Sequence, residues 1–151
     1  MKQKVFFNSE TLKTMSLFEK VTRSRLKDCF EDNNNLLIFV VDSGELKKAV
    51  GKAAANVKKL ETMLKRKIRI IEYHDNITRF IKSLIFPMKV ADIEIGTYDQ
   101  MSSEEKAEAI ITIIPQDHKT RGLIIGRNAS NLRNYEFIVK KYFPIRELKV
   151  Q

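Results

Sequence analysis

The feature that most constrains the fold of this chain is an internal repeat with an offset of 75 residues. Residues 50–61 read VGKAAANVKKLE, and residues 125–136 read IGRNASNLRNYE. At this offset Gly, Ala, Asn and Glu recur identically, and Val/Ile, Lys/Arg and Val/Leu recur as physical equivalents. A repeat whose period is half of a 151-residue chain predicts two copies of one structural unit. We therefore predict two domains, at residues 1–75 and 76–151.

Hydrophobic periodicity predicts similar elements in both copies. Continuous apolar runs have the length of buried strands, and apolar residues spaced three and four apart indicate helices before and after each glycine. The predicted strands are 36–41, 68–73, 91–95, 110–114 and 145–150, and the predicted helices are 10–31, 44–50, 76–86 and 117–125, with a longer helix after each glycine loop. The fold class is therefore α+β. A hairpin does not fit between residues 31 and 36, so residues 5–7 are the candidate for a further strand.

The positive charge of the chain is concentrated in two segments. The formal net charge is +9. Residues 44–70 carry nine basic and two acidic side chains, and residues 116–151 carry eight and three, which leaves the rest of the chain net negative. Both basic segments contain a copy of the repeat. This distribution favours a polyanionic partner over a general role in solubility.

Several other classes of protein are excluded by what the sequence lacks. A nucleotide-binding phosphate loop has four residues between its glycines and then Lys-Ser/Thr, whereas six residues separate Gly44 from Gly51, and Ala53 takes the place of the Ser or Thr. The single cysteine excludes a disulfide framework or a Cys-rich zinc site. No nucleophile–base pair or metal-ligand spacing is evident, so we expect neither an enzyme nor a cofactor. Since no signal peptide or membrane-spanning stretch is present, we expect a cytoplasmic protein without membrane contact.

Each glycine loop suits contact with a nucleic-acid backbone. Glycine allows phosphate to approach the main chain closely, and the N-terminus of the following helix offers N–H groups and the positive end of its dipole. Lys52 and Arg127 add a cation directly after each glycine. A glycine loop between two helices that clamps about four nucleotides of a single strand is characteristic of the KH fold. Its occurrence twice, within two basic segments, favours RNA binding.

The chain resembles the NusA family of transcription factors, specifically the short archaeal form. The residues that carry the resemblance are 16–20 (SLFEK), 36–41, 51–52 (GK), 55–61 (ANVKKLE), 72–76 (EYHDN), 87–90 (PMKV) and 125–127 (IGR). The resemblance implies an α+β fold of two tandem type II KH domains, each a three-stranded sheet covered by helices. It also implies binding of single-stranded RNA, the nascent transcript, during elongation and termination. RNA polymerase is a further candidate partner.

The predicted RNA-binding residues belong to the two loops and to the first turns of the helices that follow them. They are Gly51, Lys52, Ala53, Ala54, Val57, Lys58, Gly126, Arg127, Asn128, Ala129, Leu132 and Arg133. Val57 and Leu132 have two interpretations, because the same helical spacing places them at the border of a base-binding groove or in the core. Two other functions also stay open. The chain could be a ribosome-associated or RNA-processing KH protein, or a protein-interaction scaffold whose loops no longer bind RNA.

The fourth position of each loop departs from the family pattern, which usually has glycine there. This chain has Ala54 and Ala129. We expect these methyl groups to weaken RNA binding without abolishing it. If both alanines are helical, exchanging them for glycine should cost up to about 1 kcal/mol of stability. Aspartate at Gly51 or Gly126 should weaken RNA binding and leave folding intact.

Overall fold

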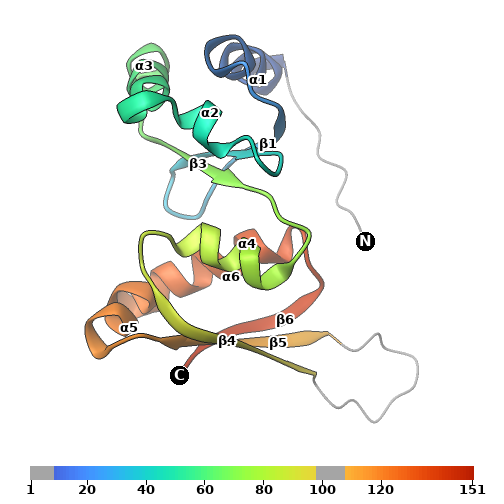
Figure 1. Ribbon diagram of the computed structural model, residues 1–151, viewed down its shortest axis with the longest axis vertical. Helices are drawn as coiled ribbons and strands as arrows, with labels where there is room; N and C mark the ends of the chain where they lie inside the picture. Colours follow the sequence, from blue (N-terminus) through green and yellow to red (C-terminus); the bar gives the residue numbers. More distant parts are fainter. Residues whose placement is uncertain (1–8, 98–107) are drawn as a thin grey trace. The chain divides into compact units, whose positions relative to one another are not determined.

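The computed structural model describes residues 9–97 and 108–151. The chain divides into two compact units, Met1–Asn76 and Ile77–Gln151. Each unit runs helix, strand, strand, helix, helix, strand, and each contains one three-stranded sheet (Figure 1). The α+β class and the tandem type II KH architecture are confirmed.

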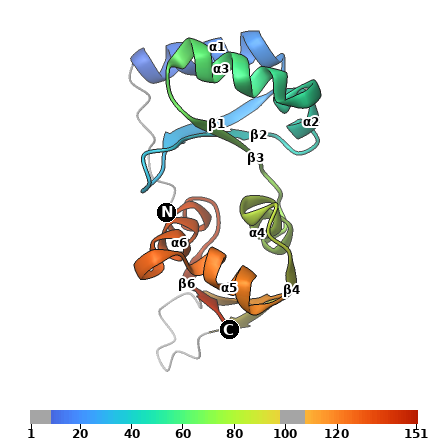
Figure 2. The same cartoon turned by 90° about the vertical axis from the view of Figure 1, so that its left-hand side faces the viewer.

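In the first unit the helices lie over one face of the sheet (Figure 2). Its elements are α1 (Ser9–Thr22), β1 (Leu26–Glu31), β2 (Leu37–Val41), α2 (Leu46–Val50), a 3₁₀ turn (Lys52–Ala54), α3 (Ala55–Leu64) and β3 (Ile68–Glu72). The central strand β2 pairs antiparallel with β1 and parallel with β3. All five residues of β2 are buried, as its continuous apolar run predicts.

The second unit repeats this topology. Its elements are α4 (Ile77–Ile85), β4 (Val90–Thr97), β5 (Ala109–Pro115), α5 (His118–Ile125), a 3₁₀ turn (Arg127–Ala129), α6 (Ser130–Lys140) and β6 (Ile145–Val150). The central strand β5 pairs antiparallel with β4 and parallel with β6. Parallel pairing requires a crossover between the two strands, and in each unit this crossover holds the pair of helices with the glycine loop between them.

The core of the first unit fixes the base of its glycine loop. The rings of Phe18 from α1 and Phe39 from β2 stack with their centroids 4.3 Å apart, and both side chains are fully buried. Ala49 of α2 and Leu60 of α3 belong to the same buried cluster. The helix before the loop and the helix after it are therefore both anchored in the core, through Ala49 and Leu60. Burial of side chains the size of Phe and Leu contributes roughly 1.5–3 kcal/mol each.

The predicted helix at 10–31 is wrong in its second half. The helix α1 ends at Thr22, and residues 26–31 form strand β1. Arg23 has a left-handed backbone with φ 55°, which stops the helix. The Thr22 hydroxyl donates to the carbonyl of Phe18 at 2.8 Å and accepts from the backbone N–H of Ser24 at 3.2 Å. These local hydrogen bonds stabilise the end of the helix at a place where the sequence has neither glycine nor proline.

The expectation that no hairpin fits after residue 31 is also wrong. One carboxylate oxygen of Asp32 accepts from the backbone N–H of Asn34 at 2.8 Å and of Leu36 at 2.9 Å. Asn35 has φ 62°, a conformation that asparagine tolerates better than most residues. This tight turn joins β1 to β2 and makes β1 the third strand of the sheet. Residues 5–7, the other candidate, lie outside the described residues.

We predict that Cys29 is unreactive in the native protein. Its side chain is only 5% exposed, and burial, reinforced by the Asp28 carboxylate, raises the thiol pKa to about 12. Because the thiolate is the reactive species, labelling by a thiol reagent at mildly alkaline pH should be slow until the protein unfolds. Labelling followed by mass spectrometry, with urea-unfolded protein as the control, measures this. Equal labelling rates in both states would contradict the packing described for β1.

Candidate nucleic-acid interface

The two glycine loops share one backbone conformation. Gly51 has φ 79° and ψ 168°, and Gly126 has φ 74° and ψ 178°. The third and fourth loop residues are left-handed in both copies. Their φ angles are 54° and 59° at Ala53 and Ala54, and 55° and 59° at Asn128 and Ala129. The quoted backbone angles of the two loops, which are 75 residues apart in sequence, therefore agree to within 10°.

A side-chain amide holds each loop against the helix before it. The Asn56 side chain donates to the backbone carbonyl of Lys48 at 3.1 Å, and Asn131 donates to the carbonyl of Leu123 at 3.0 Å. Each bond spans the loop and satisfies a carbonyl near the end of the preceding helix, which would otherwise lack a helical partner. The Asn56 bond joins α3 to α2, and the Asn131 bond joins α6 to α5.

This lock explains why the first loop residue is glycine. A Cβ atom at residue 51 would lie 3.0 Å from Cγ of Asn56, and one at residue 126 would lie 2.7 Å from Cγ of Asn131. Both glycines also have φ values that L-residues rarely adopt. Aspartate at either position is therefore strained and should destabilise its unit, contrary to the expectation of unaffected folding, so such variants are not clean probes of binding.

The helices after the two loops begin without a side-chain cap. The cap residues Ala54 and Ala129 have no side chain that accepts a hydrogen bond from the first turn. By contrast, Asp117 caps α5 by accepting from the backbone N–H of Thr120 at 2.7 Å. This bond holds the pKa of the Asp117 carboxyl below its ordinary value. An anion could therefore replace the missing cap at α3 and α6.

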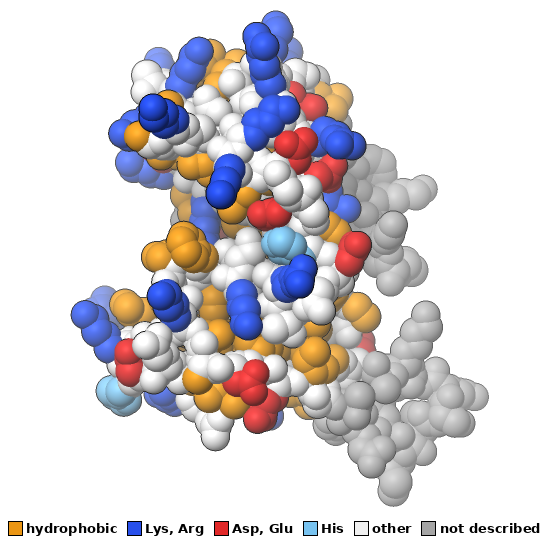
Figure 3. All heavy atoms as spheres, viewed as in Figure 1, with side chains coloured by type: hydrophobic (Ala, Val, Ile, Leu, Met, Phe, Trp, Pro, Cys, Tyr) orange, Lys and Arg blue, Asp and Glu red, His pale blue; other side chains and the backbone are white. Residues whose placement is uncertain are grey.

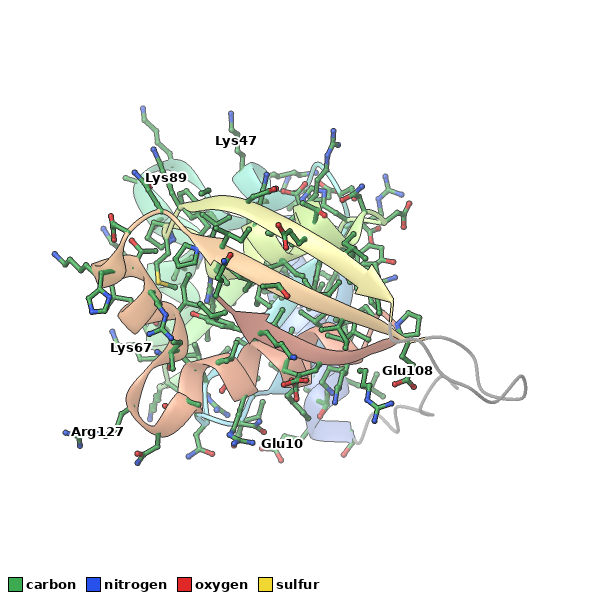
Figure 4. The ribbon with its side chains drawn as sticks, turned by 90° about the horizontal axis from the view of Figure 1, so that it is seen from below. Glu10, Lys47, Lys67, Lys89, Glu108 and Arg127 are labelled. Atoms are coloured by element: carbon green, nitrogen blue, oxygen red, sulfur yellow. The ribbon has the colours of Figure 1, made fainter. Side chains whose placement is uncertain are left out.

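A cation stands at the tip of each loop. Lys52 and Arg127 are exposed, and in Figure 4 Arg127 extends away from the ribbon of its unit. Lys58 and Arg133, one turn into the following helices, are exposed as well. Figure 3 shows Lys and Arg side chains standing out from the surface over α2 and α3. Each loop thus has one exposed cation at its tip and another one turn into the following helix, on the side of the positive end of the helix dipole.

The apolar residues predicted at the groove border are partly buried. Val57 packs against the hydrophobic core of the first unit, which favours the core interpretation for most of its surface. Leu132 is likewise partly buried. Both side chains are thus half-buried, and the core interpretation has a packing contact behind it at Val57. The exposed predicted residues are Lys52, Ala53, Lys58, Arg127, Asn128 and Arg133.

Sequence reasoning missed the structural role of Asn56 and Asn131. The signal was available, since both are identical at the 75-residue offset. A polar residue repeated five positions after a repeated glycine indicates a fixed contact between the two. The geometry of their hydrogen bonds now assigns these residues to positioning the loop.

Neither a metal site nor a membrane span is found in the described part of the chain. Within residues 9–97 and 108–151, no three His, Cys, Asp or Glu side chains gather as a metal site would require. No helix among these residues is long and apolar enough to cross a bilayer.

Comparisons with known proteins agree with this architecture, although no family model matches the chain. A probable transcription termination protein NusA from Methanocaldococcus jannaschii is 27% identical over 147 residues, which are 97% of this chain and 75% of the relative. Proteins of the same name from Thermoplasma acidophilum and Halococcus morrhuae are 22% and 24% identical, and the matches cover 94% and 99% of their lengths. The resemblance to archaeal NusA is confirmed.

A solved structure agrees with the fold as well. The crystal structure of a protein called APE1850 superimposes with a TM-score of 0.73 and 24% sequence identity, and the match covers 96% of this chain and all of that one. At this identity the match supports the fold alone. Because the match spans both units, it supports the tandem repeat of the fold and not only the fold of one half.

We predict that Ala54→Gly and Ala129→Gly stabilise the protein. The helical conformation assumed for these alanines is absent, because both have φ 59°. A left-handed conformation costs an L-residue roughly 1–2 kcal/mol, and the greater freedom of glycine in the unfolded chain offsets part of that. The free energy of unfolding, measured with urea, should rise by about 0.5–1 kcal/mol in each variant.

Ala55→Gly is the matched control. Because Ala55 has φ −58°, a helical value, this exchange should lower the free energy of unfolding by about 1 kcal/mol. Destabilisation by all three exchanges would contradict the loop geometry.

Proposed function

We propose that this protein is a single-stranded RNA-binding transcription factor that acts in elongation and termination through its two glycine loops. One observation carries the proposal. Two loops in separate copies keep the same unusual backbone, the same asparagine lock and an exposed cation at the same position. A loop that only joined two helices would not need an exposed cation at this position in both copies. The exposure of Lys52 and Arg127 before uncapped helices therefore favours a binding role.

Phosphate recognition follows from the physical properties of the loop. The helices α3 and α6 start without a side-chain cap, and the exposed cations Lys52 and Arg127 lie three residues before the first helical residue. Gly51 and Gly126 let the asparagine side chains pack against the main chain, which holds each loop in the shape that presents its cation to a phosphate. Charge-assisted hydrogen bonds of this kind are stronger than neutral ones. Phosphate contacts position a strand without reading its sequence, so bases have to be selected elsewhere.

The role in transcription is supported by the names of the relatives. Each of the three named above is called a probable transcription termination protein, and the alignments extend over nearly all of this chain. The RNA bound would then be the emerging transcript, with RNA polymerase as a further partner. Crosslinking in cells followed by sequencing of the bound RNA should recover nascent transcripts. Recovery of mainly ribosomal RNA would favour the ribosome-associated alternative.

We predict that reversing the loop cations weakens RNA binding while the fold is kept. Lys52→Glu and Arg127→Glu should each cost about 1.5–3 kcal/mol, because each removes a charged contact and adds repulsion. Fluorescence anisotropy with a labelled single strand of about ten nucleotides measures the change. Lys20→Glu on α1 and Lys82→Glu on α4 are the controls, since both are exposed lysines on other helices and alter net charge equally. Equal losses in all four variants would show a non-specific charge effect and not a site at the loops.

We also predict that RNA affinity falls steeply as salt is raised. If the two loops together meet about 4–6 phosphates, log affinity should fall with log salt at a slope of about −3 to −4. Each loop reversal should make this slope shallower by about 0.7 for every phosphate that the variant no longer binds. The measurement is a series of titrations between low and moderate salt. A flat dependence would favour the protein-interaction scaffold.

A further inference from the structure

The outward face of α6 carries an exposed aromatic ring between two cations. Arg133, Phe137 and Lys141 are spaced four residues apart and follow one another along the helix, about 6 Å of rise per step. The Phe137 side chain is 37% exposed, so its ring is accessible at the surface of the helix. The Lys141 ammonium lies 4.7 Å from the centre of its ring.

This face starts at the second glycine loop. Residue 137 lies about 12 Å along the helix from Ala129, the last loop residue. The single acidic residue in α6, Glu136, accepts from the backbone N–H of Leu148 at 3.0 Å and pairs with Lys140 at 3.5 Å. Its charge is thereby compensated. The face that continues from the loop is consequently cationic, with one apolar platform in the middle.

The first copy of the repeat lacks this arrangement and serves as an internal comparison. At the 75-residue offset, Lys58, Thr62 and Arg66 of the first copy correspond to Arg133, Phe137 and Lys141. The Thr62 hydroxyl donates to the carbonyl of Lys58 at 3.0 Å. Arg66 donates to the Glu31 carboxylate at 3.2 Å and to the carbonyl of Asn35 at 2.9 Å. The first copy thus has no ring at this place and uses its third cation within the fold.

We propose that α6 provides a second contact for single-stranded RNA, in which a base stacks on Phe137 while Arg133 and Lys141 contact the adjacent phosphates. The proposal rests on the proposed function, because the strand is held first by the second glycine loop and then continues along the helix. A ring flanked by cations is the usual platform for single-stranded nucleic acid, since every base has a stacking face and every link a negative charge. A surface cation–π contact is weak enough for the base to displace Lys141 from the ring.

The consequence is that the two copies have different roles. Both loops bind the backbone, but only the second copy continues onto an aromatic platform. This predicts a binding site longer than the roughly four nucleotides that one glycine loop clamps. It also supplies the base contact that phosphate binding alone does not provide.

The test compares a short and a long RNA on the full chain. A strand of about four nucleotides fills one loop, whereas one of about ten nucleotides also reaches residue 137. Phe137→Leu keeps an apolar side chain at this position but removes the ring. We expect it to weaken binding of the longer strand by at least fivefold and to leave the shorter strand unchanged. Phe137→Tyr should retain the parent affinity, and Thr62→Ala in the first copy should have no effect.

The outcomes separate this inference from the proposed function. If Phe137→Leu binds both strands like the parent, the platform is refuted while the loops remain the site. If Arg127→Glu binds like the parent but Phe137→Leu does not, the loop proposal fails and the contact on α6 stands. A parent that binds neither strand refutes both, and the exposed ring would then be a protein contact. Thermal melts confirm that each variant is folded, and Phe137→Ala provides a second truncation if the leucine variant melts early.

Discussion

The candidate site depends on one contact that occurs twice, the packing of an asparagine amide over a glycine that has no Cβ. At Gly51 and Gly126 the main chain takes φ 79° and 74°, and the amides of Asn56 and Asn131 cross the loop to carbonyls of the preceding helix. This contact fixes where the second helix of each pair begins. The exposed cation and the uncapped start of the following helix take their positions from it.

The loops hold strain that the rest of each unit offsets. Four non-glycine residues, Ala53, Ala54, Asn128 and Ala129, have left-handed conformations that cost roughly 1 kcal/mol or more each. The buried cluster on either side of the first loop, including Ala49 and Leu60, keeps the helix ends in place despite that cost. Backbone strain of this kind clusters at functional sites of proteins, and here it occurs in both copies of the loop.

The sequence predicted this architecture where its signals were local and repeated. The apolar runs of β2 and β5 and the recurring glycine located the central strands and the loops. The end of α1 was not predictable, because Arg23 adopts a left-handed conformation without glycine or proline nearby. The left-handed alanines were also missed, since alanine has the highest intrinsic preference for a helix and the asparagine contact that shapes each loop is a tertiary feature. Phe137 was overlooked because one ring on a polar helix face has no periodic signal, and its exposure is a property of the fold.

The account is tested most directly by following the backbone amides of the isotope-labelled full chain in NMR spectra during titration with a short single-stranded RNA. If the two loops are the site, the largest chemical-shift changes belong to residues 51–56 and 126–131, and they diminish together as salt is raised. The amides of β4, β5 and β6, whose sheet faces the viewer in Figure 4, should change little. Large changes confined to the strands, with both loops unaffected at saturating RNA, would contradict the account.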